Sequence, residues 1–532
     1  MYPSKNNSHR IVLTAIGIAV LVMGIILFLI PSALFPDPAN GFQVLRSMHL
    51  GGGFNNIVAP DQSDISQDYT EYLTWWSPGQ YLVPYLFKLA AGITMGQAIA
   101  ITVTLCTAFG LIGFYLFFKK VGFSPVISAL SLVFMICQVA FFVPYVYYNG
   151  GEILLFAFEG WFLYGCASIS KPGIKVVLFV LFAGWAGFFF KSSFVWIYLA
   201  GLCCLWVRLC AKQKGIRGWI KSTLWVGIPA AISLTAIYVC FVSKGQNPAS
   251  AAKGLKLTAE TFSFPLASPI LSGFSIDDFV HGLIYHFGKP LFAAGWSVAI
   301  LFLLSLLSLV LILLIVRRVT NNTYRLFLTL FYFAALVFFG FAYLRQLNIS
   351  YEARHFRIIG ILMVPGIIWL VSRSALPLKV MFTLICLGIA SFSVHYLYKG
   401  FYINQTICAH GPTGIAQPNI DQESLNTVIR LDKENKHAIF VFINNDIGLE
   451  VLHNRIITLP VVNDDLKIDM DEYTYDGFAG PLYIVLPETY NGPKEKLIMK
   501  SFKGYAGWNL SMLSKDYVLY SAKKKPLLNP PR

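Results

Sequence analysis

Two polar segments of an otherwise apolar chain carry side chains suited to catalysis. Asp37 follows a long apolar stretch directly, and a carboxylate placed near a hydroxyl can serve as a general base. The alternative is that Asp37 only caps the helix that follows it. The second segment contains Arg354, His355 and Arg357 within four residues. Arginine forks suit phosphate oxygens, although basic side chains also anchor helices at a membrane surface.

Ionisable residues also interrupt the apolar segments themselves. Glu152 and Glu159 are seven residues apart, so on a helix they share one face. Lys191 lies in the short turn between two apolar stretches. Charged groups at such depths normally face a polar cavity and take part in function, the other explanation being a structural ion pair. We therefore expect Lys191 to be a candidate phosphate ligand.

Further candidates lie between the first two predicted membrane segments. On a helix Asp64, Asp68 and Glu71 would lie four and three residues apart, hence on one face. That face is either a solvated acidic surface or a site for an acceptor or a metal. Aromatic side chains in the same loop could stack on a sugar ring or belong to the membrane belt: Trp75, Trp76 and Tyr81.

The composition decides the class of protein that must position these residues. The chain has 532 residues, of which 56% are hydrophobic and only 13% charged. Soluble domains carry about one quarter charged residues, and a helix needs about 20 apolar residues to cross a bilayer. The sequence therefore predicts a multi-pass α-helical membrane protein with about eleven spans, at 11–34, 95–118, 124–143, 149–169, 174–190, 193–208, 222–242, 291–316, 325–344, 357–372 and 377–397.

The distribution of basic residues predicts the orientation. Lysine and arginine clusters fall on alternate loops, as the positive-inside rule requires of cytoplasmic loops. The N-terminus is then cytoplasmic, and the odd number of spans places the tail outside. The formal net charge of +15 is explained by these loops, so no nucleic-acid partner is expected. The nine cysteines show no spacing typical of metal ligands.

Two domains are expected. Residues 1–398 form the membrane domain, with external loops at 35–94, 243–290 and 345–356. The middle loop, which contains Asp277 and Asp278, either covers the site as a lid or packs on the tail. Residues 399–532 alternate predicted strands and helices, which indicates a small external α/β domain. The strands are expected at 438–443, 483–486 and 517–520, and the helices at 421–434 and 493–502.

Several motifs of the membrane part resemble the GT-C superfamily of membrane glycosyltransferases, such as protein O-mannosyltransferases and lipid A aminoarabinose transferases. The first outer loop of that family opens with an acidic residue heading a short helix that ends in glycines, as Asp37 and Gly51-Gly52-Gly53 do here. An aromatic-Pro-Gly segment follows, here Trp76-Ser77-Pro78-Gly79-Gln80-Tyr81. A late arginine–aromatic pair then precedes a proline, here Pro365. The sequence departs from the family where Pro38 replaces the usual second acid.

The resemblance implies an enzyme that transfers a sugar from a polyprenyl-phosphate carrier, with inversion, on the outer face of the cell membrane. The acceptor is an envelope glycan, a lipid or a protein, and the membrane is the plasma or bacterial inner membrane. It further implies Asp37 as the general base and a cationic set that holds the leaving phosphate: Arg354, His355, Arg357 and Lys191. No cofactor is certain, and a divalent cation such as Mg²⁺ or Mn²⁺ stays open. The alternatives are a transporter or flippase of lipid-linked sugars and a non-catalytic membrane scaffold.

Overall fold

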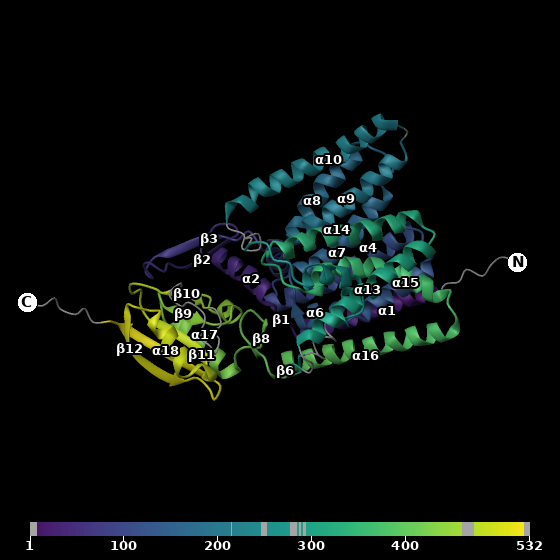
Figure 1. The fold of residues 1–532 in the computed structure, drawn as a ribbon. Helices are drawn as coiled ribbons and strands as arrows, with labels where there is room; N and C mark the ends of the chain where they lie inside the picture. Colours follow the sequence, from purple (N-terminus) through teal and green to yellow (C-terminus); the bar gives the residue numbers. More distant parts are fainter. Residues whose placement is uncertain are drawn as a thin grey trace, which may run out of the picture. The chain divides into compact units, whose positions relative to one another are not determined.

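A computed structural model describes residues 8–213, 215–245, 253–276, 285–286, 289–290, 294–459 and 473–525 (Figure 1). The chain divides into two compact units. The first comprises Met1–Ile26, Val103–Tyr145 and Gly151–Tyr398. The second comprises Leu27–Thr102, Val146–Gly150 and Lys399–Arg532. The first outer loop of the sequence therefore belongs to the same unit as the tail.

The first unit is helical. Its helices are α5 (Pro125–Ile136), α6 (Val139–Val146), α7 (Gly151–Ser168), α8 (Ile174–Phe190), α9 (Phe194–Ala211), α10 (Gly215–Cys240), η1 (Val242–Lys244), α11 (Glu260–Gly273), α13 (Ala294–Arg318), α14 (Asn322–Leu344), η3 (Ala353–Phe356) and α15 (Arg357–Ser372). The short strands β5 (Tyr285–His286) and β6 (Lys289–Pro290) pair with each other. Three long helices continue from one unit into the other: α1 (Ser8–Leu29), α4 (Met95–Lys120) and α16 (Leu376–Thr406); α6 does so by its last residue.

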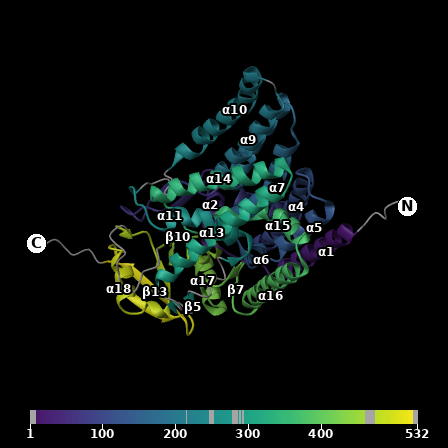
Figure 2. The ribbon, with the colours of Figure 1, turned by 45° about the vertical axis from the view of Figure 1, so that its right-hand side comes forward.

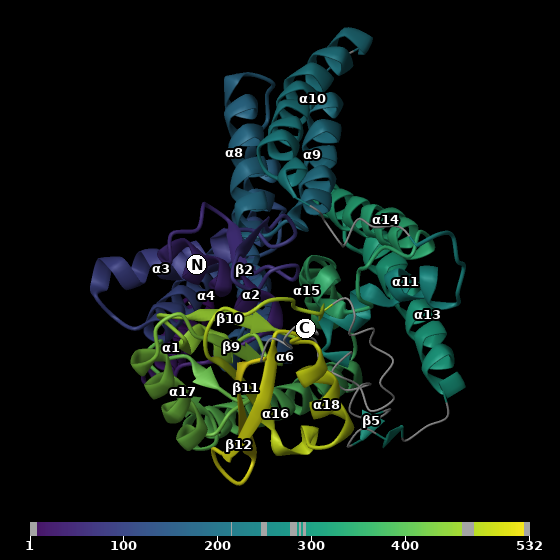
Figure 3. The same ribbon diagram turned by 90° about the vertical axis from the view of Figure 1, so that its left-hand side faces the viewer.

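Two groups of neighbouring helices build this unit. Helices α8, α9 and α10 pack together, as Figures 1 and 3 show from two sides. Helix α11 packs against α13, α14 and α15 (Figure 2). Buried aromatic rings fill the space between helices, and Phe117 and Phe327 meet with ring centroids 5.2 Å apart. Such packing fixes the start of α15 and the ends of α7 and α8, which carry the candidate site.

The predicted spans all correspond to helices, and the chain is a multi-pass membrane protein. Among the described residues, eight helices are long and apolar enough to cross a membrane. A ninth is obtained if α5 and α6, which meet at a 53° bend, form one broken span. Helix α8 has only 17 residues, and α7 carries Glu152 and Glu159. The number of eleven crossings therefore stays a prediction.

The segment 243–290, expected as an outer loop, contains a helix that the sequence analysis did not predict. Helix α11 has two internal prolines and is mostly buried. Side chains of neighbouring helices donate to its backbone carbonyls, for example Ser305 to Ser263 across 2.7 Å and Tyr332 to Leu266 across 2.8 Å. These bonds attach α11 to the neighbouring helices α13 and α14. Asp277 and Asp278 lie outside the described residues.

The second unit begins with the first outer loop. Its elements before the tail are β1 (Ala33–Leu34), α2 (Pro36–His49), β2 (Asn56–Pro60), β3 (Asp68–Tyr72), α3 (Gly79–Ala91) and β4 (Tyr147–Tyr148). Helix α2 ends before Gly51, whose φ of 96° lies in the left-handed region that favours glycine. The short helix expected between Asp37 and the three glycines is therefore confirmed.

The tail is a three-layer α/β structure (Figure 3). Its elements are β7 (Ala409–His410), β8 (Ala416–Gln417), α17 (Gln422–Glu434), β9 (Ile439–Phe442), η4 (Ile447–Glu450), β10 (Arg455–Thr458), β11 (Leu482–Pro487), η6 (Glu488–Tyr490), α18 (Pro493–Lys500), β12 (Tyr505–Met512) and β13 (Tyr517–Lys524). The sheet order is β10-β9-β11-β13-β12, with parallel pairs from β10 to β11 and antiparallel pairs beyond.

Alternation along the strands explains the three layers. Ile439 and Val441 of β9 pack in one core with Ile498 of α18. Phe440 packs in the other core with Leu425 of α17, because successive side chains of a strand point to opposite faces. The α/β prediction and its three strands and two helices are confirmed. Strands β10 and β12 were not predicted, since their sequences lack a continuous apolar run.

Candidate functional site

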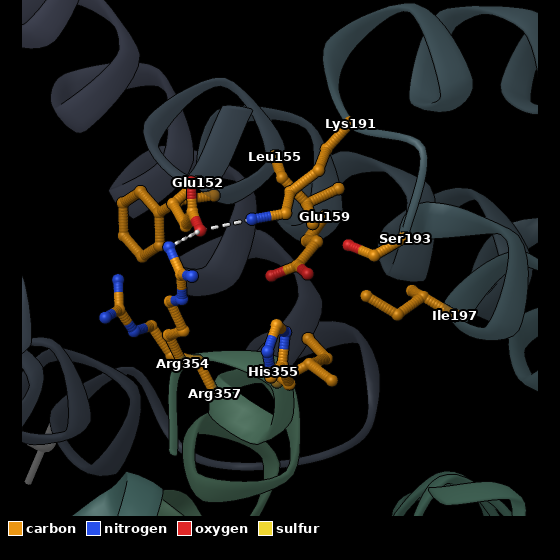
Figure 4. A pocket seen from close by; sticks show the side chains of 11 residues that line it. Glu152, Leu155, Glu159, Lys191, Ser193, Ile197, Arg354, His355 and Arg357 are labelled. Carbon is orange, nitrogen blue, oxygen red and sulfur yellow. Dashed lines mark hydrogen bonds and ion pairs between the residues drawn. The ribbon is translucent and has the colours of Figure 1, made fainter. Parts of the chain in front are cut away.

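The first unit contains a small cavity of about 30 Å³ whose lining is unusually rich in charge (Figure 4). Three elements supply the charged side chains. Glu152 lies in the first turn of α7, and Lys191 follows the last residue of α8 with an extended backbone. Arg354 and Arg357 belong to η3 and the start of α15. The cavity is therefore assembled from segments that lie far apart in the sequence.

Glu152 is the carboxylate on which two cations converge. It forms an ion pair with Lys191, and Arg354 Nη1 lies 3.3 Å from Glu152 Oε1. The Glu152 side chain is only 10% exposed, so water screens these pairs weakly. Arg354 also pairs with Glu352, which is 43% exposed and therefore contributes less. The buried carboxylate holds both basic side chains at the cavity.

Glu159 lies two helical turns farther along α7 and is 5% exposed. It interacts electrostatically with Arg357 and Lys191. The cavity lining thus holds three cationic side chains and two carboxylates. The lining alone therefore has one more cationic side chain than carboxylates, with Glu352 outside it as a further partner of Arg354, and this favours an anion such as a phosphate.

His355 lies on the same wall. Its ring centroid is 6.0 Å from that of Phe339, and its Nε2 is 3.3 Å from Ser350 Oγ. It interacts electrostatically with Lys191 and Arg354. The structure therefore brings together all four residues that the sequence analysis assigned to phosphate binding. Their function as phosphate ligands stays a prediction.

The sequence analysis did not include Glu152 among the site residues. It identified Glu152 and Glu159 only as acids on one helical face, for which an ion pair was one explanation. The missing information was the proximity of α7 to the α8–α9 turn. A usable signal was present, since an intramembrane acid requires a cationic partner and Lys191 was a candidate at the same expected depth.

Asp37 belongs to the second unit and lies in the first turn of α2. The capping alternative is wrong, because the N-cap position is occupied by Phe35 and no side-chain cap is formed there. Asp37 is half-buried between Pro36 and Pro38. Its side chain lies near the positive end of the α2 dipole.

The three other acids do not share a helical face. Asp68 and Glu71 lie on β3, which pairs with β2 in a hairpin, so they point to opposite sides of a strand. Asp64 accepts hydrogen bonds from the side chain and the backbone N–H of Ser66, and these bonds lower its pKa. Asp68 pairs with Arg455 across 2.7 Å, whereas burial raises the pKa of Glu71.

The helical expectation failed because strand pairing with β2 outweighed the spacing of the acids. The described residues contain no group of three or more His, Cys, Asp or Glu arranged to hold a metal ion. A metal site at Asp64, Asp68 or Glu71 therefore has no geometric support in this part of the chain, whereas their role in acceptor binding stays a prediction.

The three aromatic candidates differ in exposure. Tyr81 is fully buried and donates from its hydroxyl to Asn55 Oδ1 across 2.7 Å, so its ring offers no open face to a sugar. Trp75 and Trp76 are half-buried, with ring centroids 5.2 Å apart. Sugar stacking is therefore not supported for Tyr81 and stays a prediction for the two tryptophans.

Comparison with known proteins finds neither a family model nor a curated protein sequence that matches this chain. Solved structures do match. Cupriavidus metallidurans ArnT bound to undecaprenyl phosphate has a TM-score of 0.50 at 10% identity, over 99% of this chain and 100% of that one. The mycobacterial arabinofuranosyltransferase AftD reaches 0.49 at 12% identity, over 96% of this chain.

The chain spans only 40% of the length of AftD. The archaeal oligosaccharyltransferase AglB from Archaeoglobus fulgidus reaches a TM-score of 0.47 at 12% identity, over all of this chain and 75% of that one. The likeness to ArnT extends over both chains almost completely, and it is also found with ArnT in the apo state. The chain therefore has the fold of the GT-C membrane glycosyltransferases.

Proposed function

We propose that this protein transfers a sugar from a polyprenyl-phosphate carrier to an acceptor hydroxyl. One observation carries the proposal: Lys191, Arg354 and Arg357 converge on one cavity inside a helical membrane unit. A cationic cavity of this kind suits the phosphate of a lipid carrier, because fixed guanidinium groups bind its oxygens without reorganisation. The GT-C fold supports the same reading, since ArnT with this fold binds undecaprenyl phosphate.

In the proposed reaction the acceptor oxygen attacks the anomeric carbon of the donor sugar. The new bond forms as the bond from that carbon to the carrier phosphate oxygen breaks, so the configuration at the carbon inverts. Asp37 takes the proton of the acceptor hydroxyl, and the bonding electrons leave with the phosphate. Lys191, Arg354 and Arg357 stabilise the negative charge that grows on the phosphate, with His355 beside them.

Positively charged loops on alternate sides support a cytoplasmic N-terminus and a tail on the outer face of a cell membrane. Nucleotide sugars are not supplied on that side, so a lipid-linked donor is the consistent choice. The acceptor is then a glycan, a lipid or a protein of the cell envelope.

Sugar transfer by the purified full chain tests the proposal. The chain is solubilised in detergent and given a polyprenyl-phosphate-linked radiolabelled sugar together with envelope extracts as acceptor. Label should pass from the lipid phase to the acceptor. Because detergent abolishes any membrane gradient, a transporter or a scaffold would produce no labelled product. Absence of transfer with every polyprenyl-phosphate sugar would refute the proposed activity.

A further inference from the structure

The second unit contains a larger cavity of about 370 Å³, formed by residues of α2, β2 and β10 together with residues near η4 and Tyr475. It is much larger than the cationic cavity of the first unit, which measures about 30 Å³. Of the described residues that line it, none is charged. The described part of its lining is therefore suited to a neutral ligand.

One wall consists of side-chain amides and hydroxyls held in place by each other. Gln43 Nε2 donates to the carbonyl of Asn445 across 2.9 Å and to Thr458 Oγ1 across 3.3 Å. The side chain of Asn445 donates to Asn40 Oδ1 across 2.7 Å. Ser47 Oγ accepts from the backbone N–H of Val58 across 3.2 Å. These bonds fix the orientation of the polar groups before any ligand binds.

The same groups keep unused hydrogen-bonding capacity. Among the described residues, no donor reaches Gln43 Oε1, although Gln43 is only 7% exposed. The hydroxyls of Ser47 and Thr458 accept bonds but have no acceptor of their own in this part of the chain. The wall therefore offers one acceptor and two donors to a ligand.

The rest of the lining is apolar and aromatic, and its half-buried members are Ile57, Val58, Ala59 and Tyr473. A pyranose or furanose unit matches both parts of the lining. Its hydroxyls donate and accept hydrogen bonds, while its C–H faces pack on aliphatic and aromatic groups. Among the described lining residues a charged ligand would find no counter-ion to offset its lost hydration, which costs several kcal/mol.

Helix α2 connects this cavity with the proposed general base. Asn40, Gln43 and Ser47 follow Asp37 at intervals of three, three and four residues. These intervals place all four side chains on one face of the helix, with Asp37 one turn before Asn40. A ligand held by the polar wall thus lies along the helical face that carries the carboxylate.

We infer that this cavity binds a neutral oligosaccharide and that this oligosaccharide is the acceptor of sugar transfer. The acceptor role in this inference rests on the proposed function. Binding itself does not depend on catalysis and can be measured separately.

The test uses saturation-transfer difference NMR on the purified full chain in detergent. The probes are uncharged glucose-, mannose-, galactose- and arabinose-based di- to tetrasaccharides, each compared with a uronic-acid analogue of the same length. Ala59→Phe fills the cavity from β2, and Thr70→Phe places the same ring on the paired strand β3, at an exposed position outside the lining. Thr458→Val removes one hydroxyl, and Thr458→Ser restores it.

Neutral probes should bind the unchanged chain, and the Thr70→Phe and Thr458→Ser variants, better than their acidic analogues. Ala59→Phe and Thr458→Val should weaken binding by at least about tenfold. Polyprenyl-phosphate binding, measured on the same samples, should stay unchanged in all variants. Unchanged neutral-sugar binding in Ala59→Phe, preference for the acidic probes, or transfer only to a peptide or a lipid would overturn the inference. If the chain without substitutions does not bind polyprenyl phosphate, that result counts against the proposed function instead.

Discussion

Arg354 donates a hydrogen bond to Glu152 across 3.3 Å, although 202 residues separate the two in the sequence. The same carboxylate pairs with Lys191, so one acid that is only 10% exposed is shared by two bases. A phosphate entering the cavity would compete with Glu152 for these bases. Glu152 therefore holds Lys191 and Arg354 in position at the cavity.

Replacing Glu152 by Gln tests this relationship. We expect Glu152→Gln to lower the free energy of unfolding by about 3 kcal/mol, because Lys191 and Arg354 lose their shared counter-ion. Polyprenyl phosphate should raise the melting temperature of this variant more than that of the unchanged chain, since its charge replaces the lost carboxylate. Thermal unfolding in detergent measures both effects. Glu434→Gln is the control, because Glu434 is 54% exposed and its pair with Arg430 contributes little. Equal melting temperatures in Glu152→Gln and the control would contradict this role.

Arg354→Ala should weaken use of the donor. A hydrogen bond to a charged group contributes about 1.5–3 kcal/mol, so the KM for the polyprenyl-phosphate sugar should rise by about 10- to 100-fold. Arg354→Lys should restore this only in part, because lysine lacks the planar fork. Steady-state transfer assays at varied donor concentration give the result. Arg345→Ala, from the same outer segment but outside the cavity lining, should behave normally. Full activity of an Arg354→Ala, Arg357→Ala double variant would end the phosphate assignment.

The Asp37→Asn substitution tests whether Asp37 acts as a base, because it changes the chemistry of the side chain while keeping its shape. Asparagine is nearly the same size but cannot take the acceptor proton, and a general base accelerates a reaction by about 10² to 10⁴. We expect a folded variant that still binds donor and transfers sugar at least 100-fold more slowly. The comparison variants are Asp64→Asn and Asp68→Asn, whose carboxylates are held by Ser66 and Arg455. Near-normal transfer by Asp37→Asn with loss in either comparison variant would show that the base was misassigned.

The hydrogen bonds of Asp432 lead us to expect that the stability of the tail falls at low pH. Burial alone would raise its pKa, but hydrogen bonds from His453, Asn454 and the backbone outweigh burial and lower it below 3.8. A depressed pKa stabilises the folded state above the pKa of the unfolded chain, and this contribution is lost as pH falls through the folded value. Asp432→Asn should therefore lower stability by about 1–3 kcal/mol at pH 7, with a smaller difference below pH ~4. Thermal scans between pH 3 and 7 measure it, and a difference independent of pH would contradict the assignment.

The orientation is tested by a reporter fused after residue 400. An enzyme that is active only outside the cytoplasm should be active at this position, since the basic loops predict an external tail. A second fusion after Lys120, expected to be cytoplasmic, is the matched control. The reverse pattern of activity would place the proposed site on the wrong side of the membrane.

The sequence alone determined the class of the molecule. Apolar runs of about 20 residues predict membrane helices because the bilayer admits no unpaired backbone groups, and each predicted run forms a helix. Alternation of strands and helices likewise predicted the α/β tail. The structure agrees, because Ile439 and Phe440 of one strand are buried in two different cores. The arginine cluster and Asp37 were recognisable because ionisable residues beside apolar segments are costly without a function.

Only the tertiary structure decided which residues meet. Local sequence does not encode that Glu152 lies between Lys191 and Arg354, because that proximity depends on the packing of α7, α8 and α15. It also decided that Asp68 and Glu71 lie on a hairpin, where pairing with β2 outweighs helical spacing. The cavity beside Gln43 could not be predicted from the sequence either, because Asn445 and Thr458 lie about 400 residues from Gln43 along the chain. Long-range packing and hydrogen bonding, which act between elements rather than along them, fixed both sites.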